Sequence, residues 1–167
     1  YPYNEFLRED MDFYNRSFKF AFVRNPWERL VSSYFYLSSP PTWVGSRTTL
    51  VSEYINSRAD NFLDFVKLLS VDKRMQRWVH MLPQSKFVMH EEKLMVDFIG
   101  RFENLADDIM VIAKKLKLND VEIPHMNKSR AREHYSTFYD QEAIDFVSDF
   151  YAQDIDAFQY DYASIGK

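Results

Sequence analysis

Arg24 lies where two segments of opposite character meet, and its chemistry suits the binding of an anion. The stretch "FKFAFVRNPWERLVSSY" changes at this arginine from an apolar run to a helical pattern. A planar guanidinium can hold a phosphate through two parallel hydrogen bonds. Ser32 follows eight residues later and offers a neutral donor about two helical turns along. From the residues alone, a purely structural interpretation is as good as anion binding: Arg24 could form an ion pair at the edge of a sheet, and Ser32 could be a small packing residue.

The segment before Arg24 predicts a buried strand. Phe18 to Val23 is apolar except for Lys19, a pattern typical of a parallel strand that is buried on both faces. In open parallel sheets, ligands bind beyond the carboxyl ends of the strands, near the positive end of the next helix. We therefore expect Arg24 at a ligand-binding edge.

The segment after Arg24 predicts a helix that begins at once. Asn25 is a good N-cap residue, Pro26 suits the first helical position, and Glu28 stands where a capping box places an acid. The helix is expected to run from Pro26 to about Leu37.

The rest of the chain alternates predicted strands with predicted helices, which favours an α/β fold with a parallel sheet flanked by helices. We interpret residues 1–167 as a single domain. After this helix we expect a surface loop from Ser38 to about Arg58, a short helix capped by Asp60 or Asn61, and a second short helix from Asp72 to His80. Strands are predicted at "KFVM" and "MVDFIGRF", and an amphipathic helix from Leu105 to Leu116. A basic connection from Pro124 to Arg132 then leads to a final helix, which carries an apolar stripe of Ile144, Val147, Tyr151, Ile155 and Phe158.

Composition excludes several classes of function. A net charge of −4 argues against a protein that binds nucleic acid through a general basic surface. The absence of cysteine excludes disulfides and thiolate metal sites and fits a reducing compartment. The four histidines show no metal-ligand spacing, so we expect no metal. No apolar run is long enough to predict a membrane span.

The arrangement of strand, Arg-Asn-Pro, helix and serine resembles the 3′-phosphate-binding motif of sulfotransferases, which use 3′-phosphoadenosine 5′-phosphosulfate (PAPS). In that family the matching arginine and serine hold the 3′-phosphate of the nucleotide. The resemblance therefore implies the same roles for Arg24 and Ser32, and PAPS as the sulfuryl donor.

Three further segments resemble the carbohydrate sulfotransferase branch, which is similar to sulfotransferase family 2. They are "DFIGRFENL" at Asp97 to Leu105, "HMLP" at His80 to Pro83, and the C-terminal pattern from His125 to Tyr160. The resemblance implies a P-loop-like sulfotransferase fold. It also implies transfer of a sulfuryl group to a hydroxyl of a carbohydrate, a glycan-like molecule or another small acceptor.

One part of the family pattern is not found. The family uses a 5′-phosphosulfate loop with a lysine and small residues, and the three glycines, Gly45, Gly100 and Gly166, form no such loop before Phe18. We expect this loop, and the strand that precedes it, to lie upstream of Tyr1, so that the domain is incomplete at its N-terminus. The expected location is cytoplasmic, in a bacterium, or the Golgi lumen if the missing segment carries a membrane anchor.

Five other residues are candidates for the site. His80 is a candidate general base, with a partly buried histidine at a helix end as the alternative. Lys128 and Arg130 resemble the basic flap that covers the nucleotide in this family, although such charges also suit a solvated loop. Trp43 and Arg47 could bind a sugar from the predicted loop, or that loop could simply be packed.

Two other functions compete with a PAPS-dependent enzyme. A non-catalytic nucleotide-binding or interaction module could keep the fold without the transfer site. A nucleotide kinase of similar architecture is disfavoured, because Arg24 with Ser32 has no obvious use in holding a γ-phosphate.

Overall fold

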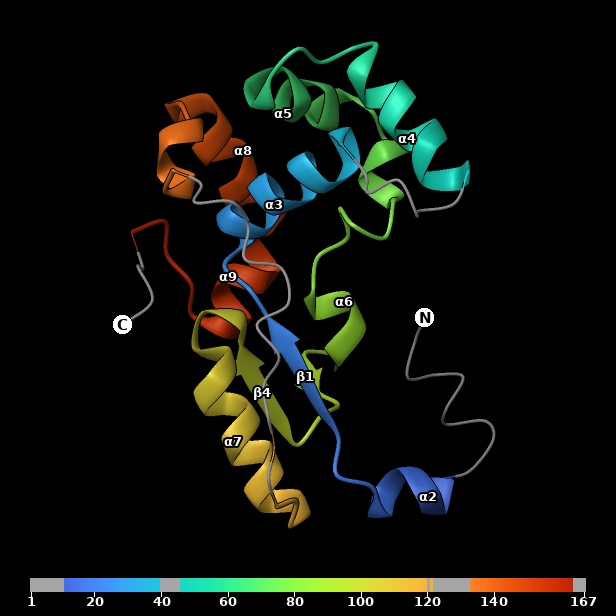
Figure 1. The fold of residues 1–167 in the computed structure, drawn as a ribbon, viewed down its shortest axis with the longest axis vertical. Helices are drawn as coiled ribbons and strands as arrows, with labels where there is room; N and C mark the ends of the chain where they lie inside the picture. Colours follow the sequence, from blue (N-terminus) through green and yellow to red (C-terminus); the bar gives the residue numbers. More distant parts are fainter. Residues whose placement is uncertain (1–10, 40–45, 120, 122–132, 164–167) are drawn as a thin grey trace. The chain divides into compact units, whose positions relative to one another are not determined.

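The computed structural model describes residues 11–39, 46–119, 121 and 133–163 (Figure 1). The chain divides into two compact units. The first comprises the described residues of segments 1–25, 84–131 and 163–167, and the second those of 26–83 and 132–162. We describe each unit by itself.

A small parallel sheet forms the centre of the first unit. Strand β1 (Phe20–Val23) pairs with β4 (Phe98–Arg101), with Phe20 opposite Phe98 and Val23 opposite Arg101 (Figure 1). Both strands are shorter than the apolar runs that predict them. The prediction of mixed α/β structure with parallel pairing is confirmed, although the described residues are mostly helical and this sheet has two strands.

Close packing joins the two strands at Gly100. A Cβ atom added at Gly100 would lie 2.4 Å from the ring of Phe22, which is its partner in the register. Helix α7 (Leu105–Leu116) then packs against β4 and buries Ile112 and Ala113, as its amphipathic pattern predicts. A side chain larger than hydrogen at position 100 would therefore force this aromatic ring to move.

The predicted strand at "KFVM" is wrong for its first three residues, and only Met89 lies in a strand. Residues 85–88 form a helical turn, α6 (Ser85–Val88), which is followed by a two-residue strand, β2 (Met89–His90). Glu91 and Glu92 adopt positive φ angles of 47° and 64°, and this tight turn leads into the antiparallel partner β3 (Lys93–Leu94). A four-residue segment is too short for its hydrophobic periodicity to distinguish a strand from a helical turn.

Two further elements complete the described part of the first unit. They are α2 (Met11–Arg16) and the 3₁₀ turn η2 (Phe102–Asn104).

Helix α3 (Pro26–Ser38) lies at the centre of the second unit. It begins at the predicted proline, and its buried side chains include Trp27, Leu30 and Val31. It contacts α4 (Ser46–Asn56), α5 (Phe62–Val71), α8 (Gln141–Phe150) and the turn η3 (Tyr135–Phe138). The element that carries Ser32 is therefore the helix around which this unit is built.

The predicted loop from Ser38 to Arg58 is wrong over Ser46–Asn56, which forms helix α4. Ile55 is fully buried, and the side chains of Ser52 and Asn56 donate hydrogen bonds to the carbonyl of Ser38. Tertiary contacts with the end of α3 thus stabilise a helix whose sequence has little amphipathic pattern.

Helix α5 (Phe62–Val71) begins as predicted, because the side chain of Asn61 accepts the N–H of Asp64. The predicted second helix from Asp72 to His80 is reduced to a 3₁₀ turn, η1 (Met75–Arg77).

The apolar stripe that was predicted for one C-terminal helix lies on two consecutive helices. They are α8 (Gln141–Phe150) and α9 (Ala152–Phe158), which meet at Tyr151. Val147, Tyr151 and Phe158 are buried, so the predicted buried face is confirmed.

Candidate functional site

Arg24 lies directly beyond the carboxyl end of β1, as predicted. The carboxyl ends of parallel strands meet at one edge, and because Val23 pairs with Arg101, Arg24 is next to Phe102 there. The guanidinium carbon of Arg24 lies over the Phe102 ring, 4.4 Å from its centre. Phe102 is 46% exposed. The edge therefore presents a cation supported by an aromatic face, which can attract an anion.

The backbone of this corner is held by two side chains. The Arg24 N–H donates to Oε1 of Gln84 at 2.9 Å, and the Gln84 amide donates to the Arg24 carbonyl at 2.8 Å. The N–H of Asn25, a buried residue, donates to Oε1 of Glu103 at 2.6 Å. Sequence reasoning missed Gln84, although it directly follows the "HMLP" segment.

Ser32 is half-buried in the second turn of α3. Arg24 belongs to the first compact unit and Ser32 to the second. The structure therefore describes each of these two residues within its own unit. Their shared role in binding a phosphate is a proposal.

His80 belongs to the second unit, and part of its surface is exposed to solvent. Its ring lies 5.6 Å from the ring of Tyr36, measured between centroids. Partial burial of the ring, and then the positive charge of Arg29, lower the pKa of His80 below its usual value of 6.5. The imidazole is therefore neutral near pH 7, as a general base requires.

Arg29 organises the "HMLP" segment. Its guanidinium donates to the carbonyl of His80 at 3.1 Å and to that of Leu82 at 2.8 Å. The guanidinium carbon lies 5.7 Å from the centre of the Tyr151 ring, and the hydroxyl of Tyr151 donates to the carbonyl of Met81 at 2.9 Å. Sequence reasoning missed Arg29, whose only signal is a charged residue five positions after Arg24.

The other candidate residues cannot be placed in a site. Trp43, Lys128 and Arg130 lie outside the described residues. Arg47 lies in α4 rather than in the predicted loop, and its side chain is not among those described.

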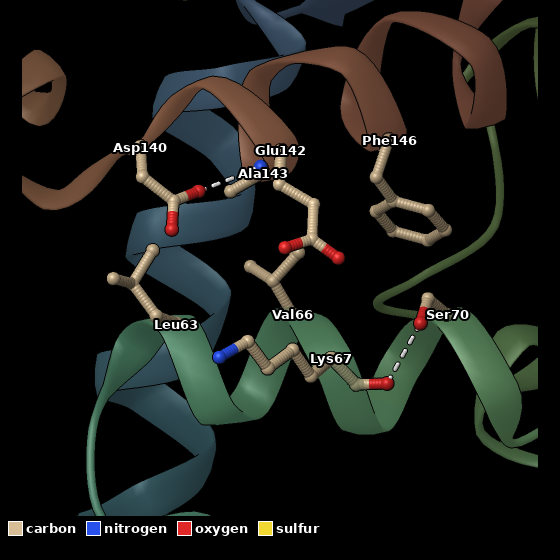
Figure 2. A pocket seen from close by; sticks show the side chains of 8 residues that line it. All are labelled: Leu63, Val66, Lys67, Ser70, Asp140, Glu142, Ala143 and Phe146. Atoms are coloured by element: carbon tan, nitrogen blue, oxygen red, sulfur yellow. Dashed lines mark hydrogen bonds between the residues drawn. The ribbon is translucent and has the colours of Figure 1, made fainter.

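Figure 2 shows a hollow between α5 and α8 in the second unit. The amine of Lys67 and the carboxylate of Glu142 lie on its two sides. The volume is about 30 Å³, whereas sites for drug-sized molecules occupy roughly 300 Å³ or more. A nucleotide or a sugar does not fit into this hollow.

A larger hollow of about 450 Å³ lies in the first unit, at the amino end of β1. Aromatic side chains dominate its lining, among them Phe13, Phe18 and Phe87. Its one lysine, Lys19, forms an ion pair with Asp97 at 2.9 Å. This hollow lies at the opposite end of β1 from Arg24 and lacks the cationic character of the predicted nucleotide edge.

Neither a metal site nor a membrane span is found within the described residues. They contain no group of three or more histidine, aspartate or glutamate side chains arranged to hold a metal ion. None of the helices in this part of the chain is both long enough and apolar enough to cross a membrane.

Comparison with known proteins gave one family and one relative. Residues 3–161 match the Sulfotransferase family. An uncharacterized protein of Archaeoglobus fulgidus is 30% identical over 102 residues, which cover 59% of this chain and 67% of that protein. No solved structure matches the chain.

Proposed function

Because the chain belongs to the Sulfotransferase family, we propose that it transfers a sulfuryl group from PAPS to a hydroxyl of a carbohydrate or glycan-like acceptor. Membership implies an enzyme with a P-loop-like fold, and sulfotransferases generally use PAPS. The observation that carries the proposal is the position of Arg24 at the carboxyl edge of the parallel strands, with its guanidinium against Phe102. This edge is where α/β proteins bind anionic ligands.

Arg24 binds the 3′-phosphate of the nucleotide in this proposal. Its guanidinium provides full charge and two parallel donors, and Ser32 adds a neutral hydroxyl. The N–H of Asn25 already donates to the carboxylate of Glu103, so the guanidinium rather than this N–H meets the charge of the phosphate. Lys128 and Arg130 are proposed to add positive charge over the bound nucleotide.

His80 is the proposed general base. In sulfuryl transfer the acceptor oxygen forms a bond to sulfur, the bond from sulfur to the leaving phosphate oxygen breaks, and the hydroxyl proton passes to a base. The lowered pKa of His80 keeps its ring able to accept that proton near pH 7. Its exposure allows an acceptor to approach.

The carbohydrate acceptor is supported by the resemblance of "DFIGRFENL" and the C-terminal pattern to the carbohydrate branch. Trp43 and Arg47 are proposed to contact the sugar, because an aromatic ring can cover the apolar face of a sugar while a guanidinium donates to its hydroxyls. We leave Tyr54 of α4 out of this proposal, because its side chain already has partners within its own unit. Its hydroxyl donates to Asp72, its ring packs against Trp78, and Arg58 lies over it.

The test is transfer of radiolabelled sulfate from PAPS to a panel of saccharides and phenols. The protein is expressed with any residues that its gene encodes before Tyr1. We expect labelled saccharides, and a lower rate for Trp43→Ala with saccharides alone. A preference for phenols over every sugar would reject the carbohydrate acceptor. Nucleotide binding without transfer to any acceptor would favour a non-catalytic module.

A further inference from the structure

The side chain of Gln84 forms a closed pair of hydrogen bonds with the main chain of Arg24. Its Oε1 accepts the Arg24 N–H at 2.9 Å, and its Nε2 donates to the Arg24 carbonyl at 2.8 Å. A carboxamide has one acceptor and one donor side by side, so it can satisfy both main-chain polar groups of a residue. Gln84 therefore bonds to Arg24 as a neighbouring strand would.

This bridge lies where the sheet stops providing hydrogen bonds. The register of β1 with β4 ends at the pair Val23 and Arg101, and Arg24 is the first residue beyond it. Gln84 is the N-cap residue of α6, and its own carbonyl accepts the N–H of Phe87. The amide that holds Arg24 is thus anchored in a helical turn.

The neighbouring contacts restrict the same corner. The N–H of Asn25 donates to Glu103, and the Arg24 guanidinium lies over the ring of Phe102. Gln84 fixes the main chain of Arg24, whereas Phe102 limits its side chain. A guanidinium that is already held in place loses less conformational freedom when an anion binds, and this raises affinity.

We infer that Gln84 is a positioning residue for the 3′-phosphate site. It touches no part of the nucleotide and acts through the backbone of Arg24. The inference rests on the proposed function, because it assumes that Arg24 binds the 3′-phosphate. The neutrality of the amide also matters. A carboxylate at position 84 would repel the Arg24 carbonyl and bring a negative charge near the phosphate site.

The test compares affinity for 3′-phosphoadenosine 5′-phosphate with affinity for adenosine 5′-phosphate. Gln84→Met removes both hydrogen bonds at nearly constant volume, and Gln84→Asn keeps an amide that is too short to reach both groups. Gln76→Met is the matched control. Gln76 is also half-buried, and its amide donates to the carbonyls of Leu69 and Ser70 in the other unit.

Both Gln84 variants should lower the ratio of the two affinities by about 3- to 30-fold, the scale of one or two hydrogen bonds. Gln76→Met should leave the ratio unchanged, even where it lowers the melting temperature by as much as the Gln84 variants do. In an Arg24→Ala background, Gln84→Met should reduce the ratio no further, because the guanidinium that Gln84 positions is gone.

Variants of Arg24 and Gln84 distinguish failure of the site from failure of the positioning role. If Arg24→Ala leaves the ratio unchanged, the proposed 3′-phosphate site is wrong, and the inference about Gln84 fails with it. If Arg24→Ala lowers the ratio but the Gln84 variants behave like Gln76→Met, the site stands and the positioning role is overturned.

Discussion

The guanidinium carbon of Arg24 lies 4.4 Å from the centre of the Phe102 ring, at the edge where β1 and β4 both end. Phe102 is 46% exposed, so nearly half of its surface faces solvent. A ring that stays exposed while it supports an arginine is more useful for orienting that arginine than for folding.

Phe102→Leu should therefore reduce the free energy of binding of 3′-phosphoadenosine 5′-phosphate by more than it reduces the free energy of unfolding. A cation over an exposed ring is worth about 0.5–1 kcal/mol, which corresponds to roughly 2- to 5-fold in affinity. Titration calorimetry measures this change. Phe20→Leu is the control, since Phe20 is 44% exposed at the other end of β1. Equal losses of affinity in both variants would contradict the role given to Phe102.

Tyr151→Phe should destabilise the protein. Tyr151 is 1% exposed, and its hydroxyl donates to the carbonyl of Met81 at 2.9 Å. Removing the donor leaves a carbonyl without this bond, at a cost of about 1–3 kcal/mol in the free energy of unfolding. Urea denaturation measures the change. Tyr36→Phe, at a tyrosine that is 37% exposed, should change stability much less. A loss from Tyr36→Phe as large as that from Tyr151→Phe would count against this explanation.

Gly100→Ala should weaken the contact between the two parallel strands. The new Cβ atom would lie 2.4 Å from the Phe22 ring, so the ring or the strand must shift. Overpacking of this kind costs about 1–3 kcal/mol. The double variant Gly100→Ala with Phe22→Leu should recover part of the loss, as a double-mutant cycle in urea would reveal. No coupling between the two changes would show that the clash is relieved in another way.

The pH dependence of sulfuryl transfer should identify His80 as the base. Partial burial and the charge of Arg29 lower its pKa below 6.5, so the ring stays neutral near pH 7 and gains a proton only at lower pH. The rate should fall as pH decreases below about 6.5, the ordinary histidine value. The unfolded chain takes up this proton at higher pH than the folded chain. Stability should therefore also decrease as pH falls through this range.

His80→Gln should lower the transfer rate and remove the acid limb of its pH profile. Measurement of initial rates over the acid range tests both effects. His90→Gln is the control, because His90 is also exposed and does not belong to the "HMLP" segment. An acid limb that persists in His80→Gln would assign the base to another residue.

Local sequence signals predicted the elements that carry the best candidates. The apolar run before Arg24 and the proline after it predicted β1 and α3, and Asn61 predicted the start of α5. These signals are local, because they depend on burial and on helix-capping chemistry. They are sufficient to predict that Arg24 lies at the carboxyl edge of the sheet, which the register of β1 with β4 confirms.

Long-range contacts account for what the sequence did not reveal. Helix α4 is stabilised by hydrogen bonds from Ser52 and Asn56 to the end of α3, and no pattern within its own sequence predicts it. Gln84 reaches a residue 60 positions away, and Glu103 one 78 positions away. Such contacts follow from the arrangement of the chain, and no local period encodes them.

The role of Arg24 is best tested by a calorimetric comparison of two ligands that differ only in the 3′-phosphate. The protein should bind 3′-phosphoadenosine 5′-phosphate more tightly than adenosine 5′-phosphate. Arg24→Ala should remove about 1.5–3 kcal/mol of that difference, the scale of a hydrogen bond to a charged group, and Ser32→Ala should remove less. If Arg24→Ala weakens both ligands equally, or neither, Arg24 does not bind the 3′-phosphate and the proposed nucleotide site is wrong.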